Sequence, residues 1–387
     1  MTLNLLAAAL LLWADLAAVV PPTKLQSPAF LAIGFEVLAI ANLVFAFSWL
    51  FSCHKSWCIV SILAILFSSS QLRASFSLNF SPARGWRSAS AWHFEKERLT
   101  ESQANRDRDR FAVEERELSV LTYNTHLLQN NTPVEQNELL RYIHTSGADI
   151  VCMQEYAVYK DAHYPTFDQV KNALADTYPY TYFDFSVHNG RLQFGLAVYS
   201  KFPLINKTTI PINTTGNGAN YCDVIARGDT FRLFNNHLQS NSIQSSEIDS
   251  LLSRNAKEYT MHSHSQLTGK LSQAYAARTA QVEAVRAAID ASPYPVIVCG
   301  DFNDVPASYA YRHVSQGLKD AFLTTSFLRT GHTYVRRRTI PKFRSSSLTP
   351  GIRIDYILTS PKLRATDCRV DRVPYSDHYP VIATLTW

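Results

Sequence analysis

Apolar residues are spread unevenly along the chain and divide it into two parts. Three long apolar stretches lie at residues 3–20, 30–51 and 56–72. A bilayer core about 30 Å thick requires about 20 mostly apolar residues in a helix. The N-terminal region, residues 1–72, therefore predicts an anchor of about three transmembrane helices. Two alternatives remain open: a signal peptide in the first stretch, although no Lys or Arg precedes it, and buried helices of a soluble protein.

Beyond residue 117 the pattern changes to short apolar runs that are bounded by turn residues. Runs at 118–123, 149–154, 195–200, 231–236, 295–300, 354–358 and 381–385 predict β-strands. Apolar residues with helical spacing occur at 135–144, 167–175 and 271–289. Strands with a few intervening helices predict one α/β (α+β) domain over residues 118–387, built from two packed sheets flanked by helices.

The segment between these parts, residues 73–117, is polar and highly charged, and it includes the alternating run Arg106–Arg110. This composition predicts a solvated linker. The alternative is a segment that lies in a membrane interface and uses Trp86, Trp92 and Phe94 as anchors.

Charge adds one constraint to this picture. The 387 residues carry a formal net charge of +5, and the 18% charged and 12% aromatic content excludes a disordered chain. Six cysteines are too few for a disulfide scaffold.

The orientation of the predicted anchor depends on few charges. Residues 1–75 contain only three Lys or Arg residues, Lys24, Lys55 and Arg73. Their positions slightly favour a cytoplasmic location for the soluble domain, but so few charges leave the side of the membrane open.

Polar side chains lie at the ends of six of the predicted strands. In chain order they are Asn124, Gln154-Glu155, Asn236-His237, Asp301 with Asn303, Asp355, and Asp377-His378. Each alone could be a turn residue or a structural histidine, but six together indicate one site. Carboxylate and amide oxygens suit Mg²⁺ or Mn²⁺, and two histidines supply donors for a phosphate. The chain has no Cys-x-x-Cys zinc spacing, no Gly-x-Ser-x-Gly elbow and no P-loop, so the pattern predicts phosphate-ester hydrolysis.

These residues, in this order, resemble the motifs of the endonuclease/exonuclease/phosphatase superfamily. The motifs that carry the resemblance are Asn124, Gln154-Glu155, Asn236-His237, Gly300-Asp301-Phe302-Asn303, Arg353-Ile354-Asp355-Tyr356 and Ser376-Asp377-His378-Tyr379-Pro380. The resemblance covers about residues 118–387 and implies a four-layer αββα sandwich with the site at one edge of two mixed sheets. The whole chain resembles membrane-anchored members from Bacteroidetes-type bacteria, which implies a multi-pass protein of a bacterial inner membrane.

The resemblance also implies a ligand set. Glu155 would be the principal ligand for Mg²⁺ or Mn²⁺, and Asn124 and Asp377 would help directly or through water. Whether one or two metal ions act stays open. Substrate binding is expected from Asn236, Asn303 and His237.

In catalysis, the resemblance implies that Asp301 orients or deprotonates the attacking water and that Asn303 holds the phosphate and that aspartate. His237 and His378 would donate to non-bridging oxygens and stabilise charge that develops in the transition state. Asp355 would orient His378 and keep it cationic. The reaction would be in-line attack of water without a covalent intermediate. No acid that orients His237 can be identified in the sequence.

Three functions are compatible with this pattern. A membrane tether favours a lipid head group or another envelope phosphodiester as the substrate. The basic stretches at 336–338 and 342–344 suit nucleic acid or an anionic membrane surface, so a tethered DNA or RNA nuclease is the second candidate. A catalytically silent membrane scaffold with the same fold is the third. The sequence indicates no protein partner and no oligomeric state.

Overall fold

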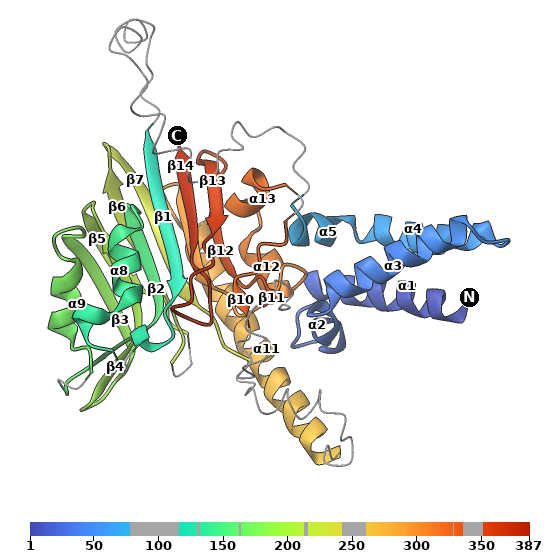
Figure 1. Ribbon diagram of the computed structural model, residues 1–387, viewed down its shortest axis with the longest axis horizontal. Helices are drawn as coiled ribbons and strands as arrows, with labels where there is room; N and C mark the ends of the chain where they lie inside the picture. The colour runs from blue at the N-terminus through green and yellow to red at the C-terminus, as the bar shows by residue number, and fades with distance from the viewer. Residues whose placement is uncertain are drawn as a thin grey trace, which may run out of the picture.

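A computed structural model describes residues 1–77, 116–129, 132–161, 164–212, 216–241, 261–327, 329–335 and 351–387. Most of the predicted linker at 73–117 and both basic stretches at 336–344 lie outside these ranges. The chain forms a β-sandwich with helices on its outer faces and a helical N-terminal unit on one side (Figure 1).

Two six-stranded sheets form the sandwich. The first sheet has the order β13 (Arg364–Val370), β14 (Val381–Thr386), β1 (Glu117–Asn124), β2 (Ile150–Tyr159), β4 (Leu192–Ser200) and β3 (Tyr180–His188). The second has the order β5 (Leu204–Thr209), β6 (Gly218–Ala226), β7 (Asp229–His237), β8 (Val296–Asp301), β12 (Asp355–Thr359) and β9 (Lys319–Asp320). The pairs β1–β2 and β7–β8 are parallel and their neighbours are antiparallel, so both sheets are mixed, as predicted.

Helices cover the outer faces of both sheets. The helices α8 (Glu138–Thr145) and α9 (Phe167–Leu174) pack on the first sheet, and α11 (Met261–Asp290) and α12 (Tyr309–Val314) pack on the second. Side chains of Asn137 and Thr166 cap α8 and α9. The smaller elements are α13 (Ala321–Thr325), the two-stranded sheet of β10 (Tyr334–Val335) and β11 (Gly351–Ile352), and 3-10 turns at Leu127–Gln129 and Val134–Gln136.

Alternate residues of the central strands enter different cores. In β1, Val120 packs between the two sheets, whereas Leu121 packs against the helices of the first sheet. In β8, Ile297 faces the other sheet and Val298 faces α11. Both faces of these strands are buried, and for that reason the strands read as continuous apolar runs in the sequence.

The two parallel pairs bring the polar strand ends to one edge of the sandwich. Asn124 is in register with Gln154 in the first sheet, and His237 is in register with Asp301 in the second. Asp355 begins β12 opposite Asp301. Because parallel strands end at the same edge of a sheet, four of the six predicted strand ends converge through strand pairing alone.

A buried amide pair joins the sheets near this edge. The Gln154 side chain donates to Asn235 Oδ1 at 2.7 Å, across the interior of the sandwich. The Asn235 amide in turn donates to the backbone carbonyls of Met153 and Ala197 at 3.1 and 3.2 Å. Most buried polar groups in proteins are hydrogen-bonded, and these three hydrogen bonds fix how the edges of the two sheets meet.

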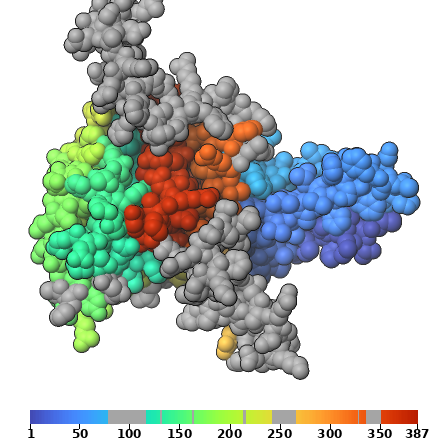
Figure 2. All heavy atoms as spheres, viewed as in Figure 1, coloured from blue at the N-terminus to red at the C-terminus, as the bar shows by residue number. Residues whose placement is uncertain are grey.

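The N-terminal unit, residues 1–77, projects away from the sandwich, and its base contacts the sandwich (Figures 1 and 2). Its helices are α1 (Thr2–Asp15), α2 (Ser27–Ala32), α3 (Phe35–Leu50), α4 (Cys58–Phe67) and α5 (Ser69–Ser75), with 3-10 turns at Leu16–Ala18 and Lys55–Trp57. Alanines such as Ala8, Ala39 and Ala64 are buried between the helices. Asn42 donates to the Ala7 carbonyl of the neighbouring helix at 2.9 Å.

The N-terminal helices are shorter than the apolar stretches that predicted them. Pro21 and Pro22 lie just beyond the first helix and cannot continue it, Gly34 separates α2 from α3, and the chain bends at Ser68. By length and hydropathy, no single helix among the described residues qualifies as a membrane span. Lys55–Phe67 and Ser69–Ser75 qualify only as a pair, with a bend of 65° between them.

The amide pair provides a test of the sandwich. Asn235→Leu keeps the approximate volume but leaves the Met153 and Ala197 carbonyls and the Gln154 side chain short of partners. Each unsatisfied buried group costs about 1–3 kcal/mol. We therefore expect a clear drop in the melting temperature of the full-length protein, measured by circular dichroism. Asn172→Leu on the exposed face of α9 is the control, and an equal effect of both substitutions would contradict the structural role of Asn235.

Candidate active site

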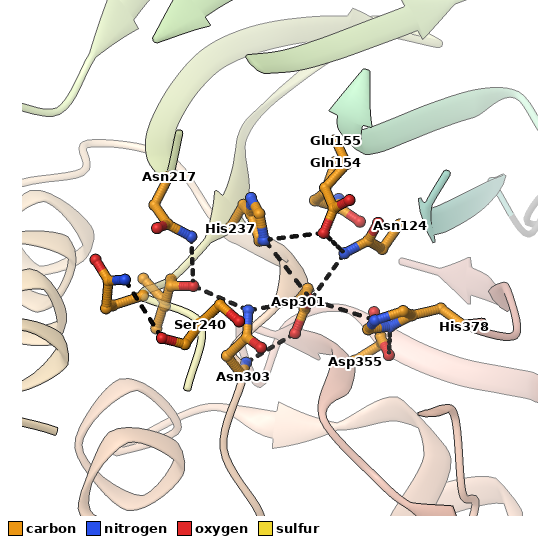
Figure 3. Close-up of polar contacts among 12 residues, drawn as sticks. Asn124, Gln154, Glu155, Asn217, His237, Ser240, Asp301, Asn303, Asp355 and His378 are labelled. Atoms are coloured by element: carbon orange, nitrogen blue, oxygen red, sulfur yellow. Dashed lines mark hydrogen bonds and ion pairs between the residues drawn. The ribbon is translucent and has the colours of Figure 1, made fainter. Parts of the chain in front are cut away.

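The carboxylate of Asp301 lies at the centre of the polar edge (Figure 3). It is fully buried. Asn124 Nδ2 donates to Asp301 Oδ2 at 2.9 Å, and the backbone N–H and side-chain amide of Asn303 donate at 2.7 and 3.2 Å. Burial raises the pKa of Asp301 to about 6, against the opposing effect of the histidines. A carboxyl group with this pKa is ionised at neutral pH and basic enough to accept a proton.

The backbone just before Asp301 is shaped by close contact between β7 and β8. Gly300 has a φ of +132°, and a Cβ there would lie 2.0 Å from the Asn236 carbonyl oxygen. Only glycine fits, because any side chain would separate the two strands. The close approach places the Asp301 and His237 side chains at the same level of the sheet.

His378 and Asp355 form a buried hydrogen-bonded pair beside Asp301. His378 Nδ1 lies 2.9 Å from Asp355 Oδ2, and Nε2 lies 3.7 Å from Asp301 Oδ2. Burial alone would lower the pKa of His378, but the charges of Asp355 and Asp301 outweigh it and raise the pKa to about 10. The imidazolium is therefore held ready to donate from Nε2, and the structure brings these two predicted site residues together.

His237 ends β7 on the opposite side of Asp301. Its Nε2 lies 3.7 Å from Glu155 Oε1 and 3.9 Å from Asp301 Oδ2. Both distances exceed hydrogen-bond length, and this buried atom has no hydrogen-bond partner among the described residues. A buried donor without a partner is costly, so Nε2 is suited to meet an oxygen of a bound ligand. Glu155 and Asp301 are the acids nearest to it.

Glu155 reaches the site because β2 contains a bulge. The register with β4 shifts between Met153 and Tyr156, and Glu155 has a φ of +49°. Burial acts to raise the pKa of Glu155, but hydrogen bonds from His126 and Asn124 and the charge of His237 lower it to about 2. The carboxylate is thus ionised under all physiological conditions, as a metal ligand must be.

The residues at this corner fit a hard divalent cation. Asn124 lies against Glu155, at 3.1 Å between Nδ2 and Oε1, and His126 Nδ1 lies between Glu155 Oε2 (3.4 Å) and Asp377 Oδ1 (3.7 Å). These residues offer mainly oxygen atoms, and two of them, Glu155 and Asp377, are acids. Mg²⁺ and Mn²⁺ prefer ligands of this kind. Ligating atoms of Asp301, Asp355 and His378 also lie within 4.8 Å of one another. That second group is less suitable, because the His378 cation already neutralises it.

Asn236 is the predicted site residue that the structure does not bring to the cluster. Its side-chain amide donates to the Cys299 carbonyl at 2.9 Å, so it ties β7 to β8. Adjacent residues of a strand point to opposite faces, and His237 occupies the face toward the site. The predicted contact of Asn236 with substrate therefore lacks support in this geometry.

Sequence reasoning missed three residues near the site. His126 touches both predicted metal-ligating acids. Asn217 donates to the Leu238 carbonyl at 2.9 Å, the same oxygen to which Asn303 donates at 3.0 Å. Thr333 accepts hydrogen bonds from the backbone at Asp355. Only His126 had a signal in the sequence, since it follows Asn124 by two positions.

The Asp355–His378 pair predicts a pH effect in the metal-free protein. A histidine whose pKa is raised from 6.5 to about 10 contributes stability that is fully present below pH 6.5 and is lost as pH rises through about 10. NMR titration in chelator should find His378 protonated at pH 8. Asp355→Asn should move its pKa down toward 6.5, while Asp367→Asn, an exposed acid in β13, should not. A His378 pKa near 6.5 in the unmodified protein would refute this electrostatic assignment.

Comparisons with known proteins identify the family. The model of the Endonuclease/Exonuclease/phosphatase family matches residues 121–378, and a model described as a domain of unknown function matches residues 1–75. No curated protein matches the chain.

Solved structures share the fold. An endonuclease/exonuclease/phosphatase from Beutenbergia cavernae is 20% identical, with a TM-score of 0.50, over 70% of this chain and 72% of that one. The chain also resembles D. rerio TDP2, crystallised with a single-strand DNA product (18% identity, TM-score 0.47, 70% and 98% covered), and sphingomyelinase C from Streptomyces griseocarneus (22%, 0.45, 69% and 99%). The matched segment of the family model contains all of the site residues described above, and the chain belongs to the endonuclease/exonuclease/phosphatase family.

Proposed function

We propose that this protein is a membrane-anchored hydrolase that cleaves a phosphodiester bond with the help of Mg²⁺ or Mn²⁺. Hydrolysis of phosphodiester bonds is the chemistry of this family. The observation that carries the proposal is the position of the buried Asp301 carboxylate. It lies between His237 and His378 and shares the Asn124 amide with Glu155. A silent scaffold would have no need to hold these groups together, because unpaired buried polar atoms destabilise a fold.

In the proposed reaction Asp301 accepts the proton of the attacking water. Asn124 and Asn303 hold both oxygens of this carboxylate through hydrogen bonds, so its orientation toward the water is fixed before substrate binds. A base with a pKa of about 6 is largely deprotonated at pH 7 and still accepts a proton effectively.

The two histidines act on the phosphate from opposite sides of Asp301. His378 is cationic and offers its Nε2–H, and His237 Nε2, 3.9 Å from Asp301 Oδ2, has no hydrogen-bond partner within the described part of the chain. Donors in such positions stabilise the extra charge of a pentacoordinate phosphate more than that of the ground state, which lowers the barrier. A divalent cation held by Glu155, Asn124 and Asp377 supplies further neutralisation of phosphoryl oxygens.

The N-terminal unit, including the predicted anchor at 1–72, supports membrane attachment. Its outer surface carries large apolar side chains, among them Leu43 (61% exposed) and Phe47 (64% exposed), while alanines fill its interior. Soluble proteins bury such residues, whereas helices in lipid place small residues at their contacts and large ones outward. The 16 residues of α3 extend about 24 Å at 1.5 Å per residue, which suits a locally thinned bilayer.

A lipid or another envelope phosphodiester is our first choice of substrate, because an anchored active site meets membrane components at high local concentration. A tethered nuclease is the second choice, and the basic residues at 336–338 and 342–344 favour it. The bacterial inner membrane remains the predicted location.

The substrate can be identified with the full-length protein in detergent micelles and Mg²⁺. The protein is incubated in parallel with mixed phospholipid vesicles, plasmid DNA and RNA, beside Asp301→Asn and a chelator control. We expect release of phospholipid head groups, with a loss of about 10²–10⁴-fold in Asp301→Asn because the general base is gone. The exposed acid Asp176 provides the control substitution, Asp176→Asn, which should retain full activity.

Each other result has a distinct meaning. Plasmid or RNA cleavage that disappears in Asp301→Asn would identify a nuclease and reject the lipid substrate. Silence on every substrate by a folded protein would support the scaffold function.

Membrane attachment is tested by flotation with vesicles of neutral phospholipid. Leu43→Lys with Phe47→Lys places two charges on the exposed apolar face of α3, where each costs about 2.5–3.5 kcal/mol in a bilayer centre. We expect the double variant to lose most of its vesicle-bound fraction. Ile225→Lys, at an exposed apolar residue of β6 in the sandwich, should float like the unmodified protein. Unchanged flotation of the double variant would reject the anchor.

A further inference from the structure

The base of the N-terminal unit packs directly on the two segments that adjoin the catalytic acids in the chain. Ala14, Ala17 and Phe35 of the N-terminal unit are buried in one cluster with Val305 and Ala307, and Ile352 packs against the same cluster. Val305 lies four positions after Asp301, and Ile352 lies three positions before Asp355. The apolar contact therefore holds the loop that follows β8 and the segment that precedes β12 on one support.

Two polar contacts cross the same boundary. His332 Nε2 lies 3.3 Å from Glu36 Oε2 at the start of α3. Arg353, which is buried, donates to the Ala74 carbonyl of α5 at 2.6 Å and pairs with Asp320 at 2.6 Å. Both partners on the catalytic side lie within a few residues of the site: Arg353 is two positions before Asp355, and His332 adjoins Thr333.

Thr333 connects this boundary to the catalytic pair. Its Oγ1 accepts hydrogen bonds from the backbone N–H groups of Ile354 and Asp355, both at 3.1 Å. Its carbonyl accepts from Tyr379 N at 2.6 Å, the residue that follows His378. Thr333 is fully buried. One residue therefore holds the backbone on both sides of the Asp355–His378 hydrogen bond.

The next residue, Tyr334, also contacts the catalytic histidine, and we call the segment His332–Tyr334 the clamp. Tyr334 forms a β-bridge with His378, and the two rings meet edge to face at 5.1 Å between centroids. The ring thereby restricts rotation of the imidazole. The segment His332–Tyr334 thus runs from the N-terminal unit at one end to the catalytic histidine at the other.

We propose that the N-terminal unit is part of the catalytic apparatus, and that it positions the Asp355–His378 pair through Glu36, His332 and Thr333. This inference rests on the proposed hydrolase function. Thr333 and Glu36 are positioning residues, since they act through Asp355 and His378. A displacement of a catalytic group by about 1 Å can cost about 10²-fold in rate. A loosened clamp should therefore lower turnover without weakening the binding of substrate.

The clamp itself is tested with Thr333→Val and Thr333→Ser in the full-length protein. Valine keeps the shape but removes the hydroxyl that receives the two N–H groups, whereas serine keeps it. We expect Thr333→Val to lower kcat by about 10–100-fold with KM within about twofold, and Thr333→Ser to restore most of kcat. Hydrogen–deuterium exchange at residues 351–358 should rise in Thr333→Val but not in Thr333→Ser.

The contribution of the N-terminal unit is tested with Glu36→Ala and Glu36→Gln. Alanine removes the partner of His332, and glutamine retains a hydrogen-bonding group. We expect Glu36→Ala to lower kcat several-fold and to raise exchange at 351–358 and 376–380, with partial rescue in Glu36→Gln. The control is Asp176→Ala, which removes the acid of a more exposed histidine–acid pair, His144–Asp176, at 3.8 Å on the far side of the first sheet.

The outcomes separate this inference from the proposed function. If the unmodified protein hydrolyses no substrate, the proposed function fails, and exchange at 351–358 still decides whether Glu36 and Thr333 hold the catalytic segment. If Thr333→Val and Glu36→Ala leave both kcat and exchange unchanged, the positioning role is overturned. If only Thr333→Val has an effect, the clamp stands and the participation of the N-terminal unit is rejected.

Discussion

The charge of Asp301, buried at the meeting point of two sheets, is the constraint on which the rest of this site depends. An ionised carboxylate without partners is unstable in a protein interior, so donors must reach it from all sides. Asn124 comes from the first sheet, Asn303 from the loop after β8, and the histidines from β7 and from the segment before β14. Two parallel strand pairs and the Gln154–Asn235 pair between the sheets hold these donors at one level.

Much of this arrangement could be predicted from the sequence because it depends on strand pairing. Continuous apolar runs indicated strands that are buried on both faces, and the polar residues after those runs indicated one edge. Asn236 is the predicted residue that lies apart from the cluster, for a local reason: its neighbour His237 takes the face toward the site, and two adjacent strand residues cannot share that face. Thr333 could not be found, since it belongs to a short segment without periodicity and acts only through backbone groups of residues distant in the sequence.

The N-terminal unit shows a different limit of sequence patterns. Hydropathy detected apolar helices, but the prolines, Gly34 and the bend at Ser68 decided where they end. Apolar composition also gave no indication that the base of this unit packs next to the catalytic acids, because that contact uses alanines, a few larger apolar residues such as Phe35, and one acid, Glu36. An interface of small residues is recognisable only when both surfaces are seen together.

Backbone conformation at the site has a consequence for the evolution of this protein. Glu155 and Asn303 both adopt left-handed backbone angles, with φ of +49° and +52°, and such strain costs of order 1–3 kcal/mol at a residue that is not glycine. Glycine would adopt the same angles freely. Glycine at either position would therefore relieve the backbone strain. The same substitutions would remove the Glu155 carboxylate and the Asn303 amide that donates to Asp301, so selection for stability alone and selection for the site oppose each other at these two positions.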